Sequence, residues 1–340
     1  MQPPKLSDAR GAYWGHLPTP DGSPSRSSGA LDLITPIGFG DDEHPQRADG
    51  LQTRLCDLGC GAKVDIIADR YADQNDWPAW RQLQDLRAPG TDHSWLWLAA
   101  TPAGSAFCGQ EFCTAARLRI GAPIIETEQE CAVCGGQVDV RGLHSLCCAP
   151  GESTRGHNWV CNSLLHLSSL SDSSSVAEPR GLVPSRPTLR PADIFTTTAF
   201  GSGAAVDVSI VSPDGEGAGA DACQAAADGK MKKYGEVLAE LREEGIRYMP
   251  TVWSCWGRPD TQSVEAVRVL AGAAARRRGL GDPTTLVRRA HAVVGTQIWR
   301  RAACMVHACL GRTPVEDVDA LLPLGHDEEE EPLGSAAPRP

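Results

Sequence analysis

An aspartate inside an apolar, strand-like run constrains this chain more than any other feature. The run extends from Ala204 to Val211 and is apolar enough to be a buried β-strand, but Asp207 interrupts it. A carboxylate in such a strand is costly to bury unless it is paired or binds a cation. A second segment rich in β-branched residues follows Asp193, and the glycine-rich stretch 201–203 would join the two segments as antiparallel strands. We therefore expect Asp193 and Asp207 to lie close together at one end of a sheet.

Two converging carboxylates repel each other, and a divalent cation is the usual resolution. Further along the chain, Lys230, Lys233 and Tyr234 are spaced i, i+3, i+4, so they share one face of a predicted helix. The pattern predicts that this helix continues to about Glu244. A carboxylate pair with a lysine is what metal-assisted hydrolysis of a phosphodiester needs. Lys230, or Lys233 as the alternative, would complete such a group. The structural alternative is a helix with solvated lysines and a strand aspartate that caps a turn.

The cysteines follow a metal-ligand pattern. The chain has 13 cysteines, and Cys131 and Cys134 form a Cys-x-x-Cys turn that His144 and Cys148 follow. Such a turn brings two thiolates to one ion, and the glycines directly after it let the backbone turn back. Thiolate and imidazole are ligands that zinc prefers, and a closed set of four is structural rather than catalytic. The spacing therefore predicts a zinc knuckle, with Cys147 as the competitor for the last position.

Together these motifs resemble the C-terminal region of reverse-transcriptase proteins of non-LTR retrotransposons, which joins a zinc knuckle to a restriction-like endonuclease. That family carries Arg/Lys-Pro-Asp, then an aspartate in an Asp-Val-x-Val strand, then Lys-x-x-Lys-Tyr. The resemblance covers roughly residues 95 to 310 and favours Cys148 over Cys147 as the fourth zinc ligand. Two departures are Ala192, inserted after Pro191, and Ser209, which stands where related nucleases carry a lysine. The matching nuclease positions are Arg190, Asp193, Asp207, Lys230, Lys233 and Tyr234.

The resemblance implies an α/β fold with a mixed sheet flanked by helices, a zinc knuckle before it, and disordered termini. It implies nicking of DNA with Mg²⁺ or Mn²⁺ held by Asp193 and Asp207, and a nuclear location. Element RNA and a separate reverse-transcriptase domain are further expected partners, because the chain shows no polymerase motif of its own. The predicted parts are a weakly structured segment 1–75, a helical linker 76–130, the knuckle 131–150, the nuclease core 151–260, a basic helix pair 261–312 and an acidic disordered tail 313–340.

Two residues near the nuclease motifs have open roles. His157 lies in Arg-Gly-His-Asn, where the family has Arg-His-Asn. We interpret it as a satisfied structural histidine, with capping of the helix or contact with a phosphate as the alternatives. Glu178 lies in Glu-Pro-Arg, which also resembles the family, and it would either add a third carboxylate to the metal site or lie on the surface.

Charge is distributed unevenly along the chain. The net charge of −11 argues against a generally basic nucleic-acid binder. However, arginines are concentrated between Arg258 and Arg312, and an acidic tail follows them. We expect Arg190 and the run Arg276, Arg277 and Arg278 to contact phosphates, although a solvated arginine-rich helix pair fits equally. The alternative function is a zinc-dependent nucleic-acid-binding module that has lost its chemistry, or a relic without function. The sequence contains no run of 18 apolar residues, so it predicts no membrane-spanning helix.

Overall fold

The computed structural model describes residues 46–96, 108–215 and 221–312, and it divides the chain into two compact units, Met1–Trp80 and Arg81–Pro340. In the first unit, helix α2 (Gln46–Asp73) runs through much of the segment that we expected to be weakly structured, so that expectation is wrong for this part. The predicted disordered segments before residue 46 and after residue 312 lie outside the described residues.

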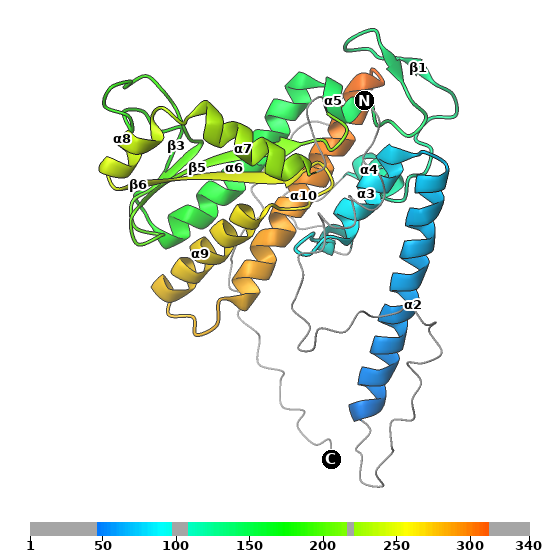
Figure 1. The fold of residues 1–340 in the computed structure, drawn as a ribbon, viewed down its shortest axis with the longest axis horizontal. Coiled ribbons are helices and arrows are strands. Elements are labelled where there is room, and N and C mark those ends of the chain that lie inside the picture. The colour runs from blue at the N-terminus through cyan, green and yellow to red at the C-terminus, as the bar shows by residue number, and fades with distance from the viewer. Residues whose placement is uncertain (1–45, 97–107, 216–220, 313–340) are drawn as a thin grey trace, which may run out of the picture. The chain divides into compact units, whose positions relative to one another are not determined.

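The second unit is mixed α/β and contains a four-stranded sheet in the order β3-β4-β5-β6 (Figure 1). The strands are β3 (Val176–Ala177), β4 (Ile194–Thr196), β5 (Gly203–Val211) and β6 (Ile246–Ser254). β4 pairs antiparallel with β3 and β5, whereas β5 and β6 are parallel. The predicted antiparallel connection through 201–203 is therefore confirmed, and Gly201 supports its turn with a φ of 78°.

Helices cover both faces of this sheet. Val206 and Val208 of β5 pack in a core with α6 (Pro150–Ser171), α9 (Thr261–Arg277) and α10 (Thr284–Cys309). Ala205 packs on the other face, with Tyr234 and Leu241 beside α7 (Ala222–Lys233) and α8 (Leu238–Glu243). Successive strand residues point to opposite faces, so Asp207 shares the α7 face with Ala205.

The helix after residue 222 is interrupted at Tyr234. We expected one helix to continue to about Glu244, but α7 ends at Lys233 and α8 begins only at Leu238. Tyr234 and Val237 both turn into the core between the two helices. Their burial outweighs helical continuity, which the sequence pattern alone favoured.

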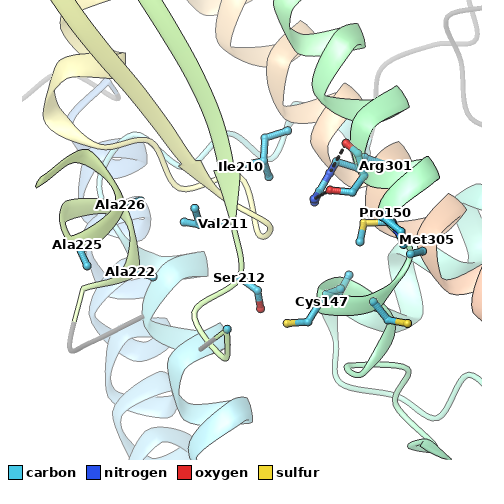
Figure 2. Close-up of a pocket in the computed structure, with 15 residues that line it drawn as sticks. Cys147, Pro150, Ile210, Val211, Ser212, Ala222, Ala225, Ala226, Arg301 and Met305 are labelled. Atoms are coloured by element: carbon cyan, nitrogen blue, oxygen red, sulfur yellow. Dashed lines mark hydrogen bonds between the residues drawn. The ribbon is translucent and has the colours of Figure 1, made fainter. Parts of the chain in front are cut away.

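The elements before α6 follow one another along the chain, and several of them contact α10. α3 (Trp77–Arg87), η1 (Ser94–Leu96) and α4 (Gly109–Arg119) are followed by the hairpin β1 (Gln129–Glu130) and β2 (Gln137–Val138) and by α5 (Ser145–Cys148). α10 contacts α4, α5, α6 and α9. It also forms part of a cavity wall opposite the end of β5 (Figure 2).

The basic stretch does not form one phosphate-facing surface. Arg258, Arg300 and Arg301 are buried, because the helix that carries the last two is the central helix of the core. The run 276–278 is exposed at the C-terminal end of α9, where basic side chains complement the helix dipole. Contact with phosphates therefore stays a prediction only for exposed arginines such as the run 276–278.

Asp172 fixes the turn between α6 and the sheet. Its carboxylate oxygen Oδ2 accepts hydrogen bonds from Thr196 Oγ1 (2.7 Å), Thr197 N (2.7 Å) and Thr198 N (2.9 Å). Burial raises the pKa of Asp172, but hydrogen bonds from Ser174 and from the threonines hold that pKa well below its usual range. This charged group thus anchors the end of β4, the strand that begins beside the predicted site.

Candidate functional site

Asp193 and Asp207 are neighbours across two strands. β4 pairs with β5 in the register Ile194–Val206, which places Asp193 opposite Asp207. Asp193 N donates to Val206 O at 3.0 Å, and Asp193 Oδ2 accepts from Val208 N at 2.7 Å. The two aspartates that the sequence pattern predicts to be close are therefore close.

Val208 lies just beyond the last paired residues of β4 and β5. Side chains, rather than the β4 backbone, form hydrogen bonds with its N–H and C=O groups on that side. Its N–H donates to the Asp193 carboxylate, and its C=O accepts from Lys230 Nζ at 3.0 Å. The same ammonium forms an ion pair with Asp207. Lys230 comes from the last turn of α7, so the start of β4 and the end of α7 meet at one peptide inside β5.

The two carboxylates have opposite electrostatic environments. Burial raises the pKa of Asp207, against the opposing effects of Lys230 and of Tyr248, whose hydroxyl donates to Asp207 Oδ2 at 2.5 Å. Burial also disfavours the charged form of Asp193, but the hydrogen bond with His157, the Val208 N–H and the Lys230 charge lower its pKa overall. Two adjacent acids with opposite shifts can take different roles in proton transfer.

His157 joins this group from the opposite face of the sheet. Its Nε2 lies 3.4 Å from Asp193 Oδ1 and 3.3 Å from the sulfur of Cys161, one turn further along α6. The donor atoms of His157, Cys161 and Asp193 all lie within 4.8 Å of one another, so they could hold a metal ion. The i, i+4 spacing of the histidine and the cysteine was visible in the sequence, but it gave no indication of the third ligand.

Other predicted site residues lie around this group. Lys233 is placed over the Tyr234 ring, 4.8 Å from its centroid, and its side chain is exposed. The Tyr234 ring is buried and meets Tyr248 edge-to-face at 5.4 Å, so it supports the tyrosine that holds Asp207. No sequence feature had singled out Tyr248 as a site residue.

Glu178 and Arg190 lie at the rim and form an ion pair with each other. Both side chains are largely exposed, and the Glu178 backbone N–H donates to Asp193 O at 2.7 Å. Glu178 is therefore linked to Asp193 through the backbone, and its carboxylate is engaged by Arg190.

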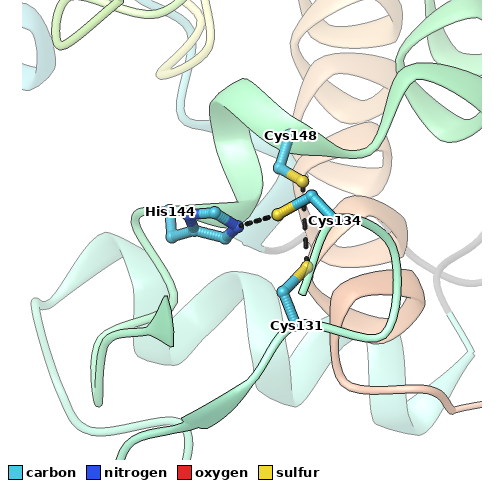
Figure 3. A group of neighbouring side chains, drawn as sticks. All are labelled: Cys131, Cys134, His144 and Cys148. Carbon is cyan, nitrogen blue, oxygen red and sulfur yellow. Dashed lines mark hydrogen bonds between the residues drawn. The ribbon is translucent and has the colours of Figure 1, made fainter. Parts of the chain in front are cut away.

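A second group of ligand atoms forms at the β1–β2 hairpin. Cys131, Cys134, His144 and Cys148 point toward one another, with all four donor atoms within 4.8 Å (Figure 3). Cys131 Sγ lies 3.7 Å from Cys148 Sγ, and Cys134 Sγ lies 3.3 Å from His144 Nε2. This group could hold a metal ion. Cys148 rather than the exposed Cys147 belongs to it.

Local backbone geometry explains why these ligands converge. Gly135 N donates to Cys131 O at 2.9 Å, and Gly135 takes a φ of 72° to turn the chain back. A Cβ at Gly136 would lie 3.2 Å from Cys134 Sγ, so glycine leaves room for the sulfur. Burial raises the pKa of the Cys131 thiol, but N–H groups of Cys134 and Val133 and neighbouring side chains lower that pKa to about 6.

Comparisons of the sequence with protein-family models and with curated proteins identify no relative. No protein-family model matches the sequence, and a search of curated proteins finds no significant match. Within the described residues, no helix combines the length and apolar character that crossing a membrane requires.

Proposed function

We propose that the protein is a metal-dependent endonuclease that nicks DNA. The observation that carries this proposal is the convergence of Asp193, Asp207 and Lys230 around Val208, from the start of β4, from β5 and from the end of α7. Two carboxylates and an ammonium at one point suit phosphodiester hydrolysis better than they suit a core, where buried charge costs stability.

Asp193 and Asp207 would hold the divalent cation. Carboxylate oxygens fit Mg²⁺ and Mn²⁺, and Mg²⁺ is commonly bound through one or two carboxylates with several waters. The imidazole of His157 offers a nitrogen beside Asp193, which favours Mn²⁺ over Mg²⁺, because Mg²⁺ prefers oxygen ligands. When bound, such an ion lowers the pKa of a coordinated water and neutralises charge on the phosphate.

The chain's own residues supply positioning and charge. Lys230 bonds to Asp207 and to the Val208 carbonyl, so its ammonium is held where negative charge would develop on the phosphate. Tyr248 keeps the Asp207 carboxylate oriented through its hydroxyl. Lys233 and Tyr234 act indirectly. Lys233 contacts the Tyr234 ring, and that ring contacts the Tyr248 ring.

We assign structural zinc to the Cys131, Cys134, His144 and Cys148 group. Tetrahedral zinc with Zn–S of ~2.3 Å and Zn–N of ~2.05 Å places two sulfurs ~3.8 Å apart and a sulfur and nitrogen ~3.6 Å apart. The separations in this group, 3.7 Å and 3.3 Å, are close to those values. Three thiols with an imidazole also favour zinc over the harder cations that fit the acidic group.

The resemblance to non-LTR retrotransposon proteins supports a restriction-like fold for the core and a zinc knuckle before it. We infer from it that the target is DNA, that the protein acts in the nucleus, and that element RNA and a separate reverse-transcriptase domain are partners. The mixed sheet with helices on both faces is compatible with this proposal.

The test is nicking of supercoiled plasmid by the purified full chain, with Mg²⁺ or Mn²⁺. Asp193→Ala, Asp207→Ala and Lys230→Ala should each lose activity, and Tyr248→Phe should lose about tenfold for one hydrogen bond. Lys233→Ala is the matched lysine control and should retain most activity. Equal nicking by the wild type and both aspartate variants would show a contaminating nuclease and contradict the proposal.

A nucleic-acid-binding module without chemistry is the second candidate. Both Asp207 oxygens already have partners in Lys230 and Tyr248, and Ser209 occupies the position where related nucleases carry a lysine. A well-folded wild type that binds DNA but nicks no plasmid with either cation would favour this candidate.

A further inference from the structure

Arg301 is a buried cation in an unusual environment. Its residue exposure is 4%, yet no carboxylate oxygen in the described part of the chain lies within ion-pair distance of it. Its Nη2 donates to Ser153 Oγ at 2.7 Å, whereas its Nη1 has no hydrogen-bond partner. A buried guanidinium normally has a partner for its charge, because desolvating it alone is costly.

The other two buried arginines of this region show the usual arrangement. Arg258 bonds to Asp85 at 2.7 Å and to Asp221 at 2.6 Å, and Arg300 lies 3.4 Å from Glu111. Burial lowers the pKa of Arg258, but the bond to Asp221 and the charge of Asp85 raise that pKa above its usual value. Burial lowers the pKa of Arg301, and no carboxylate opposes the effect.

Arg301 lines a cavity of about 500 Å³, a size in the range of small-molecule sites. Figure 2 shows Arg301 and Cys147 on one side, and Val211 and Ser212 at the end of β5 on the other. Most of the lining residues have apolar side chains, with alanines of α7, Met305 and Pro150 among them. The cavity thus combines one cation with apolar walls.

Two hydroxyl groups line the same cavity as the cation. Ser153 Oγ accepts from Arg301, and Ser212 Oγ accepts from Asp214 N at 3.3 Å, so each hydroxyl proton remains available to a ligand. The acids next to lining residues are paired with other arginines: Asp214 with Arg81, Asp221 with Arg258 and Glu152 with Arg155. Guanidinium and hydroxyl donors from opposite walls suit an oxyanion with several oxygens.

We propose that this cavity binds a phosphate monoester with an apolar or aromatic body, such as a mononucleotide or the phosphorylated end of a DNA strand. The Arg301 guanidinium and the Ser153 hydroxyl bind the phosphate, the Ser212 hydroxyl offers a further donor from the opposite wall, and the alanine wall of α7 contacts the body. This site is separate from the acidic group, because it lies at the end of β5 and its lining includes none of Asp193, Asp207 and Lys230.

The test is calorimetric titration of the full, zinc-loaded chain with deoxyadenosine monophosphate. Arg301→Gln should weaken binding by about 10- to 100-fold, the usual effect of losing a hydrogen bond to a charged group. Ala225→Trp, which fills the cavity from the opposite wall without touching the cation, should weaken it as much. Arg268→Gln removes an exposed arginine that is paired with Glu265 and should bind as the wild type does.

Further probes separate the sources and parts of the ligand. Deoxyadenosine without phosphate should bind at least tenfold more weakly, by the same hydrogen-bond argument. Competition by a 5′-phosphorylated oligonucleotide, but not by its 5′-hydroxyl form, identifies a strand end as the source, and competition by neither identifies the free nucleotide. Absence of nucleotide binding, or equal binding by wild type and a folded Arg301→Gln, overturns the proposal. Equal affinity for inorganic phosphate overturns the role of the apolar walls.

Folding of Arg301→Gln is checked by its thermal midpoint. Removing an unpaired buried charge should leave the midpoint of the ligand-free protein unchanged or higher. The nucleotide should then raise the midpoint of the wild type and not that of the variant. A raised midpoint in both proteins would show binding elsewhere and contradict the assignment.

Discussion

The Cys/His group and the acidic group assemble in opposite ways. The first takes all its ligand atoms from residues 131–148, around one hairpin and the short helix that follows. The second takes Asp193 from the start of β4, Asp207 from β5, Lys230 from α7 and His157 from α6. Local backbone geometry is sufficient to bring the first group together. The second group forms only when β4 and β5 pair in the observed register and α6 and α7 pack on the sheet.

Helix α6 connects the two groups. It begins at Pro150, two residues after the last cysteine ligand, and carries His157 toward Asp193. Displacing α6 should therefore disturb the acidic group while the Cys/His group keeps its ligands. Substitutions at four places in the chain test this difference, from the largest expected effect to the smallest.

Removing the metal ligands should have the largest effect on stability. Cys134→Ser, or treatment with a strong chelator, should remove about one equivalent of zinc and destabilise the second unit by more than ~5 kcal/mol, since structural zinc contributes ~10 kcal/mol or more to folding. Elemental analysis and thermal unfolding measure both effects. Asp207→Ala is the control from the dispersed group and should keep its zinc. Stoichiometric zinc in a Cys131/Cys134 double variant would contradict the ligand assignment.

Asp172→Ala should disturb the acidic group without touching zinc. The variant loses several hydrogen bonds to a buried carboxylate, so we expect a loss of about 3 kcal/mol at neutral pH and weaker nicking. The pKa of Asp172 is depressed in the folded state, so its contribution is present above pH ~4 and is lost as the pH falls further.

The measurement for Asp172 is denaturant unfolding of both proteins across acidic pH. The difference between wild type and variant should shrink as the pH falls below ~4. A difference that stays constant in acid would show that the charge of Asp172 has no role in holding the end of β4.

Gly156→Ala tests the connection through α6. A Cβ at this position would lie 2.3 Å from Arg301 Cγ and 2.4 Å from Arg301 Cβ. The buried aliphatic part of the Arg301 side chain, next to the α10 backbone, would therefore have to move. We expect a loss of about 1–3 kcal/mol and altered chemistry at His157, with zinc retained. Gly151→Ala in the same helix has open space and should be neutral or stabilise by up to ~1 kcal/mol. Equal stabilities for the two variants would contradict the close packing of α6 on α10.

Charge reversal of the exposed run should have the smallest effect on the fold. Changing Arg276, Arg277 and Arg278 to glutamate should cost only about 1 kcal/mol, because the exposed side chains lose no more than weak interactions with the helix dipole. If these arginines bind phosphates, DNA affinity should fall and the salt slope should decrease by about 1 for each phosphate that no longer has an arginine partner. Filter binding at several salt concentrations measures this, with Arg268→Glu as a control on the same helix. An unchanged slope would show that the run is a solvated helix end.

The sequence by itself determined the elements with strong periodicity and the ligands with local spacing. The predicted strand 204–211 matches β5 within one residue at each end, and the predicted helix pair 261–312 contains α9 and α10. The Cys-x-x-Cys turn with its glycines predicted a metal-binding group, because those contacts form within one hairpin. The pair Asp193 and Asp207 was predictable for a similar reason, since a short connection fixes the register of two adjacent strands.

Only the tertiary structure decided which side chains meet across distant elements. Tyr248 reaches Asp207 because β6 pairs parallel with β5, and no local pattern encodes that register. Burial of Tyr234 divided a helix that periodicity made continuous. Arg300 and Arg301 are adjacent on one helix, yet one faces Glu111 and the other faces Ser153 and a cavity. Sequence spacing sets the face of each residue, but packing of the other helices sets what that face meets, because burial energy depends on the partner.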